Sequence, residues 1–252
     1  MRKLRVQYLA IIGAILLLNS CASPKTVVYF WDDDGQIKNE NLLDYQPRIQ
    51  PGDELTINVS GLNQESAIPF NLYEVTNNNS NAKPITYIVT AEGFINFPVL
   101  GKIKVNGSTT QGISDKLSEL LVTYIKDPIV NVRLVNFKVA ILGEVARPGT
   151  YTLTNERVSV LDALGLAGDL TIHGKRDNVL LIREKNNNRT FIKIDLTDTK
   201  LFNSPYFYLA QNDVLYVEPN KTAVNSSRVG ANTAVIVSSI SILISLVAIL
   251  LR

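Results

Sequence analysis

The chain is poor in the side chains on which most catalytic and metal sites depend. Its 252 residues include one Cys, one His, one Met and one Trp. A single Cys excludes an intramolecular disulfide, and one Cys with one His supplies too few ligands for a Cys/His zinc site. A Ser-His-Asp or Cys-His arrangement would depend on His173 alone, which lies in the turn-like stretch 171–175. We therefore interpret His173 as a surface residue and expect no catalytic, metal or cofactor-binding site.

A strong excess of one charge is also missing. Lys and Arg number 25, and Asp and Glu number 23, which gives a formal net charge of +2. This near balance argues against a large basic face, and we expect no nucleic-acid partner. The stretch 165–168 lacks the Gly-x-x-x-x-Gly-Lys pattern that binds phosphates, so no nucleotide site is predicted.

The N-terminus has the features of a secretory signal. Three basic residues lie among the first five, and the apolar run 8–18 that follows is too short for a comfortable bilayer span. The run ends at Leu18-Asn19-Ser20-Cys21, which resembles the lipobox of bacterial lipoproteins. In such proteins the Cys thiol receives a diacylglycerol and the signal is removed. We therefore predict a signal peptide over 1–20 and lipid attachment at Cys21; the alternative is a buried Cys without this role.

A second apolar segment lies at the C-terminus. Residues 233–251 carry no charge, and a helix of this length spans roughly 28 Å, close to the thickness of a hydrocarbon core. Small and hydroxyl side chains share one face of this predicted helix: Ala234, Ser238, Ser241, Ser245 and Ala248. Such a stripe favours self-association of helices, or could line a lumen. The alternative is a plain single-span anchor whose serines bond to their own helix.

The body between these ends shows the pattern of short strands and two helices. One helix is expected after Ser108, with Gln111 three residues on as a capping box, and a shorter one after Ser159 that ends at Gly168. Alternation of apolar and polar residues predicts the strands 55–59, 85–89, 94–97, 130–134, 139–142, 179–182, 191–194 and 214–217.

Three features of the body allow more than one interpretation. Segments 53–57 and 213–217 look alike, each as a turn Asp followed by an alternating strand, but the similarity is too short to establish a repeat. The aromatic run 206–208 could stack on sugar rings, although packing beside a sheet is the more usual role. The acidic run 32–34 is interpreted as a solvated turn rather than a metal site.

The body resembles the outer-membrane polysaccharide export proteins, which are translocons of bacterial capsule and exopolysaccharide. Segments 45–55, 89–103 and 124–132 are similar to the family's export domain, and the first contains its motif Pro51-Gly52-Asp53. Segment 139–151 is similar to the start of a soluble-ligand-binding β-grasp (SLBB) unit, and 213–217 continues it.

The resemblance implies an α+β chain in which a polysaccharide export domain precedes one β-grasp-like SLBB domain and a C-terminal transmembrane helix. The predicted organisation is a lipoprotein signal peptide (1–20), a tether (21–43), the export domain (44–135), the SLBB domain (136–219), a linker (220–231) and a membrane helix (232–252).

The function implied is passive export of capsular or extracellular polysaccharide from the periplasm to the cell surface, without enzymatic activity. The expected partners are further copies of the chain in a ring homo-oligomer, the polysaccharide, and an inner-membrane polysaccharide co-polymerase or tyrosine kinase. The covalent lipid on Cys21 would anchor the chain in the outer membrane, with most of it periplasmic. Two alternatives remain open: a sugar-binding or scaffold lipoprotein without a pore, and an inner-membrane protein whose N-terminal segment is not cleaved.

Overall fold

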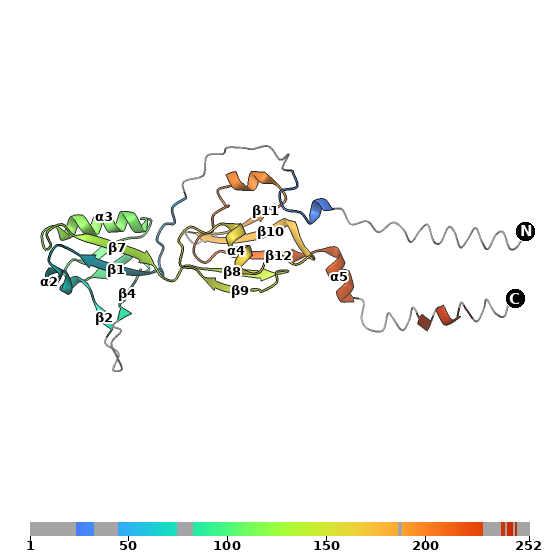
Figure 1. Cartoon of the computed structure of the whole chain (residues 1–252), viewed down its shortest axis with the longest axis horizontal. Helices are drawn as coiled ribbons and strands as arrows, with labels where there is room; N and C mark the ends of the chain where they lie inside the picture. Colours follow the sequence, from blue (N-terminus) through green and yellow to red (C-terminus); the bar gives the residue numbers. More distant parts are fainter. Residues whose placement is uncertain are drawn as a thin grey trace, which may run out of the picture.

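The structure is a computed structural model. It describes residues 24–32, 45–74, 83–185 and 188–228, and six positions near the C-terminus: 238, 239, 241–243 and 245. The body consists of two packed domains that follow one another along the chain, with the change from one to the other near residue 136 (Figure 1).

The first domain is built around a three-stranded antiparallel sheet with the order β4-β1-β7. Its central strand β1 (Glu54–Ser60) turns Leu55, Ile57 and Val59 into the core. The other elements are α2 (Gln64–Ala67), η2 (Ile68–Phe70), β2 (Tyr73–Glu74), β3 (Lys83–Pro84), β4 (Thr86–Ile88), β5 (Phe94–Phe97), β6 (Gly101–Lys104), α3 (Thr110–Leu121) and β7 (Ile129–Leu134).

Helix α3 lies against β7 and buries one face, which includes Ile113 and Leu117. Its predicted start is wrong by one residue, because the N-cap is Thr109, whose Oγ1 accepts the N–H of Gly112 at 3.0 Å. The capping box predicted for Ser108 and Gln111 is therefore not formed. The Gln111 side chain donates to Asp115 on the next turn instead, at 2.7 Å.

The second domain has a five-stranded sheet with the order β11-β10-β12-β8-β9. The pair β12·β8 is parallel and the other pairs are antiparallel, so the chain must cross over between β8 and β12. Helix α4 (Val160–Leu166) lies within this connection, and Ser159 caps it as predicted, with Asp162 completing a capping box. The other elements are β8 (Lys138–Gly143), β9 (Gly149–Thr152), β10 (Gly174–Lys185), β11 (Asn188–Ile194), η3 (Thr199–Asn203) and β12 (Val214–Pro219).

Two further elements lie outside the predicted domain ranges. Within the predicted linker, α5 (Lys221–Arg228) forms a helix, and the side chain of Asn220 accepts the N–H of Ala223 at 2.9 Å. Within the predicted tether, η1 (Pro24–Thr26) begins a segment that packs on the second domain. In Figure 1 the blue segment containing η1 and the helix α5 both lie at the end of the second domain that is remote from the first.

No helix in the described ranges is both long enough and apolar enough to cross a membrane. Most of the predicted membrane helix lies outside the described residues, so it stays a prediction.

Candidate functional site: the junction between the domains

The two segments that look alike in sequence form the same kind of turn. In the first Asp turn (50–53), Asp53 accepts the N–H of Gln50 on Oδ2 at 2.8 Å and donates its own N–H to the Gln50 carbonyl at 3.2 Å. In the second Asp turn (210–213), Asp213 makes the same two bonds with Ala210, at 2.7 and 3.2 Å. Each turn leads directly into a strand, β1 or β12. The local sequence similarity between segments 53–57 and 213–217 therefore reflects a backbone turn that the two segments share.

Both Asp turns are held by one residue of the connection between the domains, Asn136. Its Oδ1 accepts the N–H of Glu54 at 2.9 Å, and its Nδ2 donates to the carbonyl of Gly52 at 3.1 Å. On the other side, its backbone carbonyl accepts from Nε2 of Gln211 at 2.8 Å. Gln211 is buried, and its Oε1 accepts the N–H of Lys138 at 2.8 Å. Asn136 thus ties the first turn of one domain to the second turn of the other.

The carboxylate of Asp213, in the second Asp turn, forms an ion pair with Arg183 of β10. Nε of Arg183 lies 3.0 and 3.1 Å from the two carboxylate oxygens of Asp213, and Nη2 lies 2.6 Å from Oδ2. The Asp213 side chain is fully buried. Burial acts to lower the pKa of Arg183, but the hydrogen bonds and charge of Asp213 outweigh this effect and raise it. Burial also raises the pKa of Asp213, and Arg183 opposes that rise.

The first Asp turn is equally buried but is electrostatically different. Asp53 is 1% exposed, and within the described part of the chain no ion pair involves it. Burial raises the pKa of its carboxyl to about 6, and the N–H of Gln50 acts in the opposite direction. The carboxyl therefore changes charge in a range where an ordinary Asp is already ionised.

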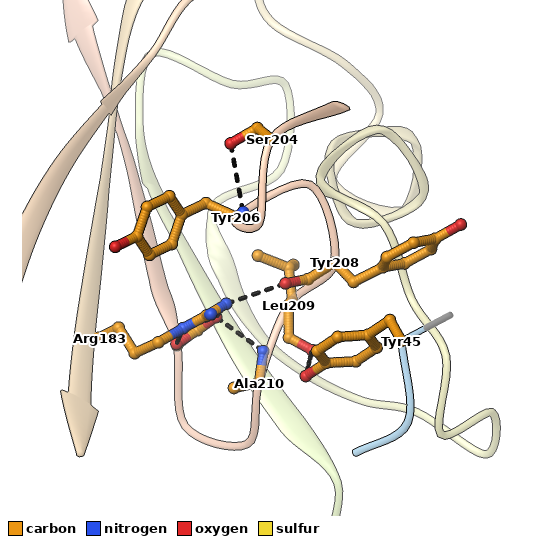
Figure 2. A network of polar contacts seen from close by, with 8 residues as sticks. Tyr45, Arg183, Ser204, Tyr206, Tyr208, Leu209 and Ala210 are labelled. Atoms are coloured by element: carbon orange, nitrogen blue, oxygen red, sulfur yellow. Dashed lines mark hydrogen bonds and ion pairs between the residues drawn. The ribbon is translucent and has the colours of Figure 1, made fainter. Parts of the chain in front are cut away.

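A second contact across the junction is made by tyrosines (Figure 2). Tyr45, in the segment that leads into the first domain, donates its hydroxyl to the Leu209 carbonyl at 2.9 Å, and its ring stacks on Tyr208 at 5.3 Å between centroids. Arg183 donates to the Tyr208 carbonyl at 2.9 Å and lies 5.6 Å from the centre of the Tyr206 ring. These rings are engaged by protein groups, which agrees with the packing interpretation of the run 206–208.

A third contact is made by Glu156 of the second domain. Its carboxylate accepts the Thr110 hydroxyl at 2.8 Å and the N–H of Leu134, at the end of β7, at 3.3 Å. The junction therefore has three braces, and they reach three different parts of the first domain. Its groups form a mechanical connection between the two domains.

The predicted site residues have different outcomes. Pro51, Gly52 and Asp53 lie in the first Asp turn and so belong to the junction. Ser238, Ser241 and Ser245 are helical and exposed, while Cys21, Ala234 and Ala248 lie outside the described residues. The Ser245 hydroxyl donates to the Ser241 carbonyl at 2.9 Å, the intrahelical bond expected of a plain single-span anchor. The roles predicted for these residues stay predictions.

Sequence reasoning missed the roles of Asn136, Gln211 and Arg183 at the junction, because polar side chains that bond across a junction follow no fixed spacing. The sequence signal near them was the likeness of the two turn segments. In the parts of the chain that the structure describes, no three His, Cys, Asp or Glu side chains gather closely enough to hold a metal ion. The absence of a metal or cofactor stays a prediction.

The fold consists of a small α+β domain joined by the three braces to a β-grasp-like domain with a mixed sheet. This combination defines the class of protein. Residues 43–135 match the family described as polysaccharide biosynthesis/export protein, and residues 137–217 match the SLBB domain. The chain carries the domains of the polysaccharide export family, and the resemblance seen in the sequence is confirmed. This family consists of transport components rather than enzymes, in agreement with the prediction of a non-enzymatic chain.

Two curated relatives carry the same name, "EPS I polysaccharide export outer membrane protein EpsA". The protein from Ralstonia nicotianae is 34% identical over 101 residues, which cover 38% of this chain and 26% of that protein. The protein from Ralstonia solanacearum is 29% identical over 103 residues, covering 40% of this chain and 27% of that protein. The matched segment thus spans about a quarter of the length of these relatives.

Proposed function

We propose that the chain is a subunit of an outer-membrane conduit through which capsular or extracellular polysaccharide passes from the periplasm to the cell surface. Membership of the export family and the names of the relatives support this role. The structural observation that carries it is the braced junction, in which Asn136 bonds to both Asp turns.

The reason is geometric. Identical subunits close into a ring only if every subunit presents its contact surfaces at the same angle. Two domains joined by a plain linker move relative to one another by default. The braces at Asn136, Tyr45 and Glu156 restrict that motion, so each subunit can contribute its two domains to two stacked tiers in a fixed orientation. Export through such a conduit is passive, and its driving force comes from other components.

The membrane attachments belong to the same proposal. A diacylglycerol on Cys21 anchors the N-terminus in the outer membrane, and the helix 232–252 spans it, so that most of the chain is periplasmic. An inner-membrane polysaccharide co-polymerase or tyrosine kinase delivers the polymer to the periplasmic end. Mass spectrometry of the mature chain and of a Cys21→Ala variant tests the lipid directly.

The central experiment combines a measurement of polymer secretion by cells with the mass of the purified particle. Deletion of the chain should abolish secreted polymer while polymer remains inside the cell, and the full chain should restore secretion. The detergent-purified protein should be a closed homo-oligomer by native mass spectrometry. A strictly monomeric particle, or normal secretion in the deletion strain, would contradict the proposal.

A scaffold or sugar-binding lipoprotein without a pore is the second candidate, and the bond from Ser245 to the Ser241 carbonyl favours it. Electrical conductance of the purified protein in planar bilayers separates the two. Substitution by Leu at Ser238, Ser241 and Ser245 should weaken assembly and secretion more than substitution by Phe at Leu243, if the serine face packs between subunits. Equal effects on both faces would favour a plain anchor.

A further inference from the structure

The segment that begins three residues after Cys21 is attached to the second domain. The N–H of Phe30 donates to the Leu196 carbonyl at 3.1 Å. The carboxylate of Asp32 accepts both the N–H and the hydroxyl of Thr199, at 2.9 and 3.0 Å. The first acid of the run 32–34 therefore binds the first residue of η3, whose N-cap is Asp198, and residues 24–32 have a defined place on this domain.

Two aromatic side chains of the segment point toward the domain. The Phe30 ring lies 4.9 Å from that of Phe202. The Tyr29 ring lies 5.4 Å from the guanidinium carbon of the buried Arg176, and its hydroxyl donates to Asp169. These contacts cover Arg176, and they fix which residues of the segment face outward.

The outward-facing apolar residues are Val28 and Trp31, which are 43% and 45% exposed. Phe202, whose ring contacts that of Phe30, is 37% exposed. Isolated exposed apolar residues are normal on protein surfaces, so exposure alone carries no conclusion. What Val28 and Trp31 contact depends on where they lie in the molecule.

Both predicted membrane attachments, the lipid on Cys21 and the helix 232–252, lead from the end of the second domain that carries Val28 and Trp31. An extended chain spans at most about 3.6 Å per residue, so Pro24 lies within roughly 11 Å of the Cys21 Cα and of any lipid attached there. The helix α5, which precedes the predicted membrane helix, lies at the same end of the second domain as η1 (Figure 1). Both routes from the body toward a membrane therefore start from one end of one domain.

We propose that Val28 and Trp31 contact the headgroup region of the phospholipid leaflet that holds the lipid of Cys21. Trp is suited to this position because its ring is apolar while its N–H can bond to headgroups or water. The contact gives the second domain a second attachment and sets its distance from the bilayer. This inference rests on the lipid anchor proposed above.

The protein contains its own probe, because Trp31 is the only Trp of the chain. The full mature chain is reconstituted in vesicles of phosphatidylethanolamine and phosphatidylglycerol, with acyl chains brominated near the headgroup, brominated near the chain end, or unbrominated. Trp31 emission should be strongly quenched by the first lipid and less by the second. The matched control is Trp31→Phe combined with Ile68→Trp, since Ile68 is 64% exposed on the first domain. Its emission should be the same in all three vesicles.

Mass spectrometry of the same samples keeps this test separate from that of the anchor. Diacylglycerol on Cys21 with unquenched Trp31 would overturn the inference and leave the anchor intact. A chain without diacylglycerol would overturn the anchor, and the inference would fall with it. Quenching of Trp31 and of the Ile68→Trp control to the same extent would also overturn it, because the contact would then not be specific to this end of the molecule.

Discussion

The first and second Asp turns have the same hydrogen bonds but different electrostatic surroundings. Asp213 lies against Arg183, whereas Asp53 is buried without an ion pair among the described residues. Transfer of a carboxylate from water to an apolar site is unfavourable unless a cation or several donors compensate. The local sequence specifies the turn, and residues far away in the chain decide whether a cation lies beside its carboxylate.

This difference divides the junction into two unequal halves. In the second domain, the turn has a charged pair, its own Gln211 bonds to Asn136 and Lys138, and Tyr45 bonds to the adjacent Leu209, so its geometry is defined by many groups. In the first domain, the turn depends on its own backbone, on Val89 and on Asn136. Substitutions that affect one half and spare the other test the comparison directly.

The largest effect is expected when Arg183 is replaced by Met. Asp213 then stays buried without its cation, and loss of one partner of such a pair costs about 3–5 kcal/mol of the free energy of unfolding. Denaturant unfolding of the full chain in detergent measures it. The matched control is Arg189→Met, because the Arg189–Glu184 pair joins β10 and β11 with side chains that are more than half exposed. Such a pair contributes at most about 1 kcal/mol.

A double variant sharpens the same prediction. Adding Asp213→Asn to Arg183→Met removes the buried charge while an amide oxygen can still accept the N–H of Ala210. Part of the lost stability should return. If Arg183→Met and Arg189→Met were equally mild, the second Asp turn would not depend on its ion pair.

The next largest effect is expected for Asn136→Ala. The substitution leaves the N–H of Glu54 and the carbonyl of Gly52 without their side-chain partner, at a cost of about 1–3 kcal/mol. The bond from Gln211 to the backbone carbonyl can persist. Asn131→Ala, on an exposed position of β7, is the control. Unfolding free energies and the yield of closed oligomers should both fall for Asn136→Ala only. A stable but unassembled variant would locate the role of Asn136 in assembly rather than in folding.

These residues also show what could be predicted from the sequence. Alternation placed β1, β7, β8 and β12, and Ser159 identified the start of α4, because such signals are local. The cap of α3 was missed by one residue because Ser108 and Thr109 are both good caps. Asn136, Arg183 and Gln211 could not be found, since their partners lie up to 84 residues away and any polar residue can make such bonds.

A smaller effect, with a characteristic pH dependence, is expected at Asp53. Between an ordinary Asp pKa of 3.8 and about 6, the folded chain retains the proton that the unfolded chain has released. The folded state then binds more protons, so the free energy of unfolding contributed by this group falls as pH rises through that window. Asp53→Asn should abolish the fall and be more stable than the wild type at neutral pH, but not at pH 4.

The contrasting variant is Asp213→Asn. It removes the anion beside Arg183 and should therefore be less stable than the wild type at neutral pH. Opposite signs for the same chemical change in two similar turns are the outcome that the comparison requires. The same sign at both positions would show that the surroundings of the two carboxyls do not differ as described.

The smallest effect is expected where the two turns differ in their third residue, which is Gly52 in one and Asn212 in the other. Both have positive φ, +88° and +65°. A Cβ at Gly52 would meet no atom within 4 Å, so Gly52→Asn should cost less than about 1 kcal/mol, because Asn tolerates this conformation. The control is Gly143→Asn, with the same φ of +88° but a Cβ only 2.1 Å from the Val217 carbonyl oxygen. There the backbone must shift and the loss in the unfolding measurement should be larger. Equal losses would mean that the positive φ angle, and not the space available for a Cβ, decides the cost at both positions.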